Sequence, residues 1–244
     1  YRYRDALLTP HPHPDPLPKG AREKDLPLHD KWILNRLQTT VNSTLEALEN
    51  FQFSVAAQTL YHFTWGDFCD WYLEAAKLSL NDEKHRAATQ NTLETVLTNI
   101  LKLLHPFQPF ITEEIWNQIL PNEKPLIISK FPVKEKPPFA TEANIFEATV
   151  KEPVEAVRNI RGESNILPGK KIPHVFSTFA DKKLATNAVN TINYVEFLAK
   201  IEKYEIVHSD KEVGDIKKSA TNVTTHQTTY IPLAGLIDLD AEKS

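Results

Sequence analysis

Four residues close to position 30 carry side chains that suit contact with unpaired nucleic-acid bases. Lys31, Asn35 and Arg36 can hydrogen-bond phosphates or base edges, and Trp32 can stack on a base. Trp32 is equally suited to a hydrophobic core, so both interpretations stay open at the sequence level. We call these four residues the first candidate group.

A second set of polar residues follows an apolar stretch near position 160. Two arginines, an asparagine and two lysines give this region a local basic character, with 5 Lys and Arg against 3 Asp and Glu over residues 151–175. They predict either a phosphate-binding edge or a charged face that keeps the domain soluble. The second candidate group consists of Arg158, Asn159, Arg161, Lys170 and Lys171.

Three carboxylates could in principle perform acid–base catalysis. Asp67, Asp70 and Glu74 are three and four positions apart, which places them on one side of a helix. No nucleophile or metal site accompanies them in the sequence. We therefore interpret them as solvated or ion-paired, with Arg36 as the predicted partner. Cys69 is interpreted as a small apolar group and not as a nucleophile.

No residue is assigned to catalysis or to a metal. The chain has six glycines and lacks a glycine-rich phosphate loop, so no cofactor is expected in this segment. Histidines without ligand spacing are interpreted as linker or structural residues: His11, His13, His62, His85 and His105.

The bulk composition is that of an ordinary globular protein. The 244 residues are 41% hydrophobic and 25% charged, with a net charge of −4. Residues 29–122 carry 6 Lys and Arg against 11 Asp and Glu, so any attraction to RNA is local. A single cysteine fits the reducing cytoplasm, no stretch suits a membrane span, and the start YRYRD suggests a piece of a longer protein.

The first half of the chain shows the three- and four-residue apolar spacing of helices. Asp30 is the expected N-cap of the first helix and Thr112 that of the fourth. Residues 126–128 read as a short strand, and Pro153 predicts a kink or a break in the helix at 143–164. The predicted helices cover residues 30–50, 53–79, 83–105, 112–120 and 143–164.

The pattern changes after residue 165. Residues 171–179, 204–208 and 223–231 read as strands, and 181–199 as a helix capped by Asp181. We therefore predict an α+β protein, a mainly helical bundle followed by a small α/β subdomain. Its parts are a proline-rich linker (1–28), the helical domain (29–165) and the subdomain (166–244), which ends at the start of a further helix.

Several ordered motifs resemble those of one family, the class I aminoacyl-tRNA synthetases and the valyl-tRNA synthetases in particular. Their anticodon-binding helical domain is similar to this chain from about residue 28 to the end. The matching stretches are WILNRL (32–37), FQFSVA (51–56), DFCDWYLE (67–74), LLHPFQPFITEEIW (103–116), VRNIR (157–161), PGKKIP (168–173) and YIPLAGLID (230–238).

The resemblance implies that the segment docks the anticodon loop of valine tRNA through the two candidate groups. The catalytic His-x-Gly-His and Lys-Met-Ser-Lys-Ser motifs of the family are absent from this sequence, which has no methionine. ATP with magnesium is expected only in the intact enzyme, which would be a cytoplasmic monomer carrying catalytic and editing domains. The alternatives are the equivalent domain of an isoleucyl- or leucyl-tRNA synthetase and a scaffold that binds no RNA.

Overall fold

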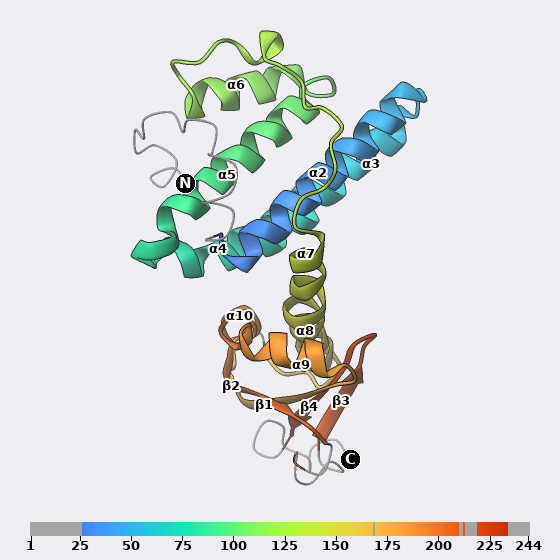
Figure 1. Cartoon of the computed structure of the whole chain (residues 1–244), viewed down its shortest axis with the longest axis vertical. Coiled ribbons are helices and arrows are strands. Elements are labelled where there is room, and N and C mark those ends of the chain that lie inside the picture. Colours follow the sequence, from blue (N-terminus) through green and yellow to red (C-terminus); the bar gives the residue numbers. More distant parts are fainter. Residues whose placement is uncertain (1–25, 168, 210–211, 213–218, 234–244) are drawn as a thin grey trace. The chain divides into compact units, whose positions relative to one another are not determined.

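The computed structural model describes residues 26–167, 169–209, 212 and 219–233. These residues form two compact units, one ending at Ala143 and one beginning at Asn144 (Figure 1). This division lies earlier in the chain than the predicted domain boundary after residue 165. The predicted boundary lies just after the helix that ends at Glu163. Nearly all of the predicted linker, and the predicted C-terminal helix start, lie outside the described residues.

The first unit is a helical bundle, as the apolar spacing predicts. The helix α2 lies along α3, and α5 packs against α2 and α4 (Figure 1). Trp32, Ile33 and Tyr72 are among its largest fully buried side chains. The helices are α2 (Leu28–Glu49), α3 (Phe53–His62), η1 (Phe63–Tyr72), α4 (Leu73–Leu80), α5 (Glu83–Leu104) and α6 (Pro109–Ile119).

The elements α3, η1 and α4 form one uninterrupted helical run whose middle part is π-helical. A π-helix closes its hydrogen bonds five residues apart, so its turns are wider than those of an α-helix. This irregularity was not predicted. The run buries Trp71 and Tyr72 and leaves Tyr61 and Trp65 60% and 57% exposed. The aromatic residues of this run are thus divided between core and surface.

The turn between α2 and α3 is a C-terminal cap built around Phe51. The amide of Gln52 donates to the carbonyl of Ala47 (2.8 Å) and that of Phe51 to the carbonyl of Leu48 (3.0 Å). This bonding pattern places the residue after the cap in the left-handed region, where glycine is usual. Phe51 takes that place with φ of 57° and an exposed ring.

Neither of the two caps predicted for the first unit is present. The helix α2 begins at Leu28, so Asp30 lies in its first turn, where its buried carboxyl group accepts from the hydroxyls of Tyr72 (2.6 Å) and Thr89 (2.8 Å). The helix α6 begins at Pro109, whose missing amide costs nothing in the first turn. Thr112 therefore lies inside α6, and its hydroxyl donates to the carbonyl of Gln108 (2.8 Å).

The predicted strand at 126–128 is a short 3-10 helix, η2 (Leu126–Ile128). The carboxylate of Glu113 fixes it by accepting from the amides of Leu126 (2.9 Å) and Ile127 (3.3 Å). Among the described residues the segment has no neighbouring strand to pair with, and the Glu113 carboxylate satisfies two of its amides instead.

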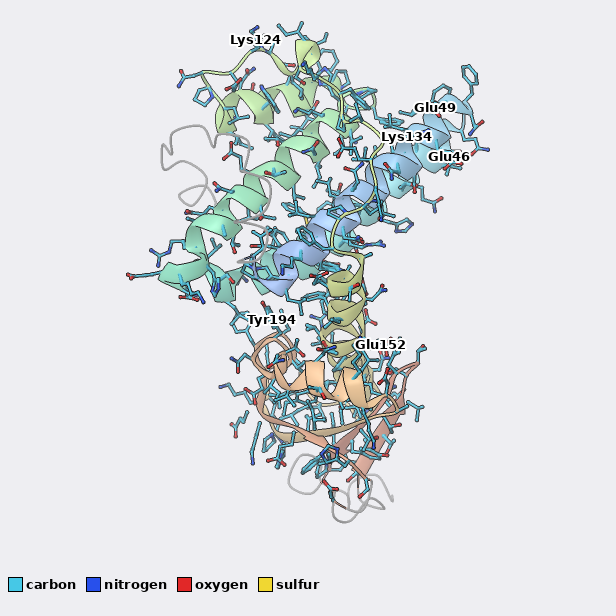
Figure 2. All side chains as sticks on the ribbon, viewed as in Figure 1. Glu46, Glu49, Lys124, Lys134, Glu152 and Tyr194 are labelled. Atoms are coloured by element: carbon cyan, nitrogen blue, oxygen red, sulfur yellow. The ribbon has the colours of Figure 1, made fainter. Side chains whose placement is uncertain are left out.

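An extended segment, residues 130–137, then runs along α2. Lys134 forms an ion pair with Glu49 at 2.5 Å (Figure 2). Three side-chain amides of α2, which we call the amide ladder, bond to backbone carbonyls of residues 133–138. They are Asn35 to Pro138 (2.5 Å), Gln38 to Val133 (3.0 Å) and Asn42 to Glu135 (2.7 Å).

A second continuous helical run leads into the second unit. It comprises α7 (Ala140–Phe146), the π-helical η3 (Glu147–Lys151) and α8 (Glu152–Glu163). Pro153 lies in the first turn of α8, directly after η3. The predicted break at Pro153 is therefore realised as a change of helix type, which accommodates the missing amide donor.

The second unit contains a four-stranded sheet with the order β2-β1-β4-β3. The strands β1 (Ile172–Phe179) and β2 (Ile201–Val207) are parallel, whereas β3 (Ser219–Val223) and β4 (Gln227–Pro232) form an antiparallel hairpin. The helix α8 packs on β3 and β4, and α10 (Ile192–Ala199) packs on β2. These contacts bury an apolar layer that includes Val195, Tyr204 and Ile231.

Two details of this unit differ from the prediction. The helix expected at 181–199 is interrupted at residues 190–191, giving α9 (Lys182–Val189) and α10. The single strand expected at 223–231 is a hairpin with its turn at residues 224–226. The cap of α9 is confirmed, because the carboxylate of Asp181 accepts from the amide of Lys183 (2.7 Å). No helix in the described ranges is both long enough and apolar enough to cross a bilayer.

Candidate nucleic-acid interface

The first candidate group is largely used within the bundle. Trp32 is completely buried, so its ring cannot stack on a base in this structure, and the core alternative is the one observed. Asn35 belongs to the amide ladder. The ammonium group of Lys31 lies 3.8 Å from the carboxylate of Glu142 and 5.8 Å from the ring centre of Phe139. Lys31 and Asn35 therefore hold the segment that follows the extended chain against α2.

Arg36 is the member of the first group that keeps a solvent-facing head. Its Nε donates to the carboxylate of Asp67 at 2.7 Å, which confirms the predicted ion pair. The side chain of Arg36 is 41% exposed and that of Asp67 is 11% exposed. Asp67 therefore orients a guanidinium group whose outer edge reaches solvent, and such a group can donate to a base or a phosphate.

The three predicted carboxylates do not form a common site. Asp67 binds Arg36, Asp70 is exposed, and Glu74 pairs with Lys77 at 2.5 Å. The thiol of Cys69 is half-buried, and burial raises its pKa, which disfavours the nucleophilic thiolate. Within the described residues no cluster of three or more His, Cys, Asp and Glu side chains is placed to hold a metal ion.

The second candidate group separates into a buried and an exposed part. Arg161 is 8% exposed, and its guanidinium donates to four backbone carbonyls, so this member of the group is used within the fold of the second unit. The carbonyls belong to Leu167 (3.4 Å), Lys170 (2.7 Å), Ala199 (3.1 Å) and Lys200 (3.1 Å). Removal from water lowers the pKa of Arg161 from its usual value, but the four acceptors suit a charged donor.

The exposed part of the second group surrounds the end of α8. Arg158 and Asn159 lie on the helix, and Lys170 and Lys171 lie just before β1, all with exposed side chains. Arg161 joins the two segments, because it binds the carbonyls of Leu167 and Lys170 from the same helix. The basic surface predicted from the sequence is therefore a single edge within the second unit.

Sequence reasoning left several surface residues of this kind out of the two candidate groups. Tyr61 and Trp65 are exposed aromatic side chains one helical turn apart, and such rings can stack on bases. Asn165 and Leu167 are exposed beside the basic edge. Their signal is weak in sequence, because spacing alone cannot tell a buried aromatic residue from an exposed one.

Comparison with known proteins places the chain in a family. Residues 30–176 match the family described as the anticodon-binding domain of tRNA ligase. The chain is 38% identical over 234 residues to the valine–tRNA ligase of Syntrophotalea carbinolica, covering 94% of this chain and 26% of that protein. It is 36% identical over 226 residues to the enzyme of Staphylococcus saprophyticus, covering 89% and 25% respectively.

The valine–tRNA ligase of Coxiella burnetii is 35% identical over 239 residues, with 91% of this chain and 26% of the relative covered. The chain thus spans about a quarter of the length of the curated relatives it matches. The matched region contains all of the first unit from Asp30 onwards and continues into β1. The chain belongs to the anticodon-binding domain family of tRNA ligases.

Proposed function

We propose that this chain is the anticodon-recognition part of a valine–tRNA ligase. The match of residues 30–176 to the anticodon-binding family carries this proposal, because that range includes Arg36 and the whole second candidate group. The three relatives described above share the name valine–tRNA ligase, which favours valine over isoleucine or leucine as the amino acid of the complete protein.

In the complete protein, ATP with magnesium would activate valine, and the activated valine would pass to the 3′ end of its tRNA. The present segment would hold the anticodon loop so that the acceptor arm reaches the distant catalytic domain of the same polypeptide, in a cytoplasmic monomer. Valine anticodons share a central adenine and the cytosine that follows it. These two bases are the natural ones to recognise, since unpaired loop bases expose their hydrogen-bonding edges.

The structure supports RNA contact despite the acidic balance of the first unit. Several of its carboxylates are already paired with cations, among them Asp67 with Arg36 and Glu49 with Lys134. Each such pair is locally neutral, so its carboxylate does not repel phosphates as an isolated charge would. The guanidinium of Arg36 and the basic edge at the end of α8 are then the groups that offer donors to RNA.

Titration of the purified chain with a valine tRNA transcript at increasing salt tests the proposal. We expect saturable binding at low salt whose affinity falls linearly on a double-logarithmic plot, with a slope set by the number of phosphates contacted. Isoleucine and leucine tRNAs serve as controls and should bind more weakly. Arg36→Ala should weaken binding more than Lys84→Ala, an exposed lysine on α5.

The acidic balance of residues 29–122 favours one other function, a scaffold that contacts protein and not RNA. A scaffold predicts no saturable binding of any tRNA at low salt. Equal binding of valine, isoleucine and leucine tRNAs would instead argue against recognition of the anticodon while leaving general RNA binding in place.

A further inference from the structure

A hollow of about 460 Å³ lies at the C-terminal end of α8, beside the basic edge. Three of its lining residues, Arg158, Arg161 and Gly162, come from the helix. The other three come from the loop that follows: Asn165, Ile166 and Leu167. The hollow is therefore built by one short stretch of chain, and its volume is within the range of small-ligand sites.

Backbone hydrogen bonds shape the floor of the hollow. The helix ends in a left-handed cap, in which the amide of Ile166 donates to the carbonyl of Arg161 (2.9 Å) and that of Asn165 to the carbonyl of Gly162 (3.3 Å). Asn165 has φ of 51°, a conformation that asparagine tolerates. The guanidinium of Arg161 also donates to the carbonyl of Leu167 (3.4 Å). These bonds define the conformation of the loop that lines the hollow.

The lining combines apolar and polar surfaces. Ile166 is buried and forms an apolar floor, while the side chain of Leu167 is 72% exposed at the rim. Arg158 brings a planar cation, and the exposed Asn165 brings an amide that both donates and accepts. Lys170 and Lys171 continue the basic edge, and the acidic side chains nearby on α8 are Glu155 and Glu163.

Gly162 leaves the hollow open. A Cβ atom added at Gly162 would meet nothing within 4 Å, so the packing of the free protein does not require glycine there. The lack of a side chain at Gly162 therefore leaves open the space in which a ligand would lie.

We infer that this hollow receives one unpaired nucleobase of the bound tRNA. A flat nucleobase suits a hollow with an apolar floor and a guanidinium group beside it, since nucleobases stack on both aromatic rings and arginine planes. The Asn165 amide can pair with the polar edge of a base, as asparagine does with adenine. The lysines at the rim complement the phosphates on either side of the base. The inference rests on the proposed function, because tRNA supplies the base.

The test fills the hollow without disturbing its walls. We expect Gly162→Leu to fold and to lower the affinity for the valine tRNA transcript by about tenfold, the value of one stacked base. The slope of affinity against salt should stay that of the wild type, because the phosphate contacts remain. Asn117→Leu is the control: it adds the same side chain at an exposed position of α6 outside both candidate groups, and its affinity should change less than twofold.

Leu167→Ser provides a second variant, since this exposed side chain contributes little to folding, with the equally exposed Ile127→Ser as its control. It should weaken tRNA binding severalfold. If the wild type binds tRNA and both Gly162→Leu and Leu167→Ser bind it equally well, the hollow is not a nucleobase site, but the proposed function stands. A reduced salt slope in Gly162→Leu also overturns it, since the variant would then have lost phosphate contacts. Absence of wild-type binding overturns the proposed function itself.

Discussion

The hydroxyl of Tyr72 donates to Oδ1 of Asp30 at 2.6 Å, across a sequence separation of 42 residues. Thr89 donates to the other carboxyl oxygen at 2.8 Å, so one buried acid joins α2, η1 and α5. All three side chains are removed from water. This network holds together the bundle that carries Arg36, and its loss would affect the RNA-binding surface indirectly.

Removing the Tyr72 hydroxyl should destabilise the protein. We expect Tyr72→Phe to lower the free energy of unfolding by about 1–3 kcal/mol, because Asp30 would keep one donor fewer in a buried site. Urea denaturation measures the change. Tyr61→Phe is the control, since the Tyr61 side chain is 60% exposed and should change stability by less than 0.5 kcal/mol, as is usual for surface positions. Equal effects of the two variants would contradict the network.

The pair His29 and Asp30 should set how stability varies with pH. Burial raises the pKa of Asp30 to about 6, although the hydrogen bonds from Tyr72 and Thr89 act in the opposite direction. Burial lowers the pKa of His29 to about 3, and the nearby His85 adds to this. The folded protein holds the proton of Asp30 more tightly than the unfolded chain does. The stability that this contributes is therefore fully present below the unfolded pKa of Asp30 and is lost as the pH rises towards 6. Stability from His29 is present above its unfolded pKa and lost as pH falls.

These two contributions oppose each other between about pH 4 and pH 6. Replacing His29 removes one of them, so the stability of His29→Gln relative to the wild type should fall as pH rises across this window. One pKa unit corresponds to about 1.4 kcal/mol, which sets the upper limit of the slope per pH unit. Urea denaturation of both proteins at pH 4, 5 and 6 measures it. A constant difference between them would show that His29 does not titrate abnormally.

The amide ladder should hold the extended segment on α2. Asn42 both donates to the carbonyl of Glu135 (2.7 Å) and accepts from its amide (3.2 Å). Asn42→Ala should therefore cost about 1 kcal/mol and accelerate hydrogen exchange at the amide of Glu135. Asn99→Ala is the matched control, because Asn99 bonds to Thr95 within its own helix. Unchanged exchange at Glu135 in Asn42→Ala would show that the segment is held by other contacts.

Arg161 should be essential to the loop that carries the basic edge. Lysine has the charge but not the fork of donors, so Arg161→Lys leaves buried carbonyls unpaired, and we expect a loss of about 3 kcal/mol. Arg158→Lys, an exposed change on the same helix, should leave the free energy of unfolding within 0.5 kcal/mol of the wild type. Wild-type stability in Arg161→Lys would mean that the four carbonyl contacts contribute little.

The sequence predicts those features that depend on local periodicity. The helices of the first unit follow from apolar residues at three- and four-residue steps, and Arg36 with Asp67 follows from matching charges on two amphipathic helices. Asp30 was misassigned as a cap because its partners, Tyr72 and Thr89, are 42 and 59 residues away. No local rule brings such residues together.

Other differences arise where the usual turn residues are missing. The hairpin between β3 and β4 turns at residues 224–226 without glycine, proline or asparagine, and Glu152 stabilises it from α8. Carboxylate bonds to Thr224 and His226 thus replace a turn signal.

Asn35 was expected at an RNA contact because its chemistry suits base edges, but an amide binds a backbone carbonyl equally well.

The most direct test of anticodon recognition compares two valine tRNA transcripts that differ only in the anticodon. One is unaltered, and in the other the central adenine and the following cytosine are both replaced. Equilibrium binding to this chain at one fixed salt concentration should be weaker for the altered transcript by at least tenfold, since each lost base contact costs about 1–3 kcal/mol. Equal affinity for the two transcripts would contradict anticodon recognition by this chain.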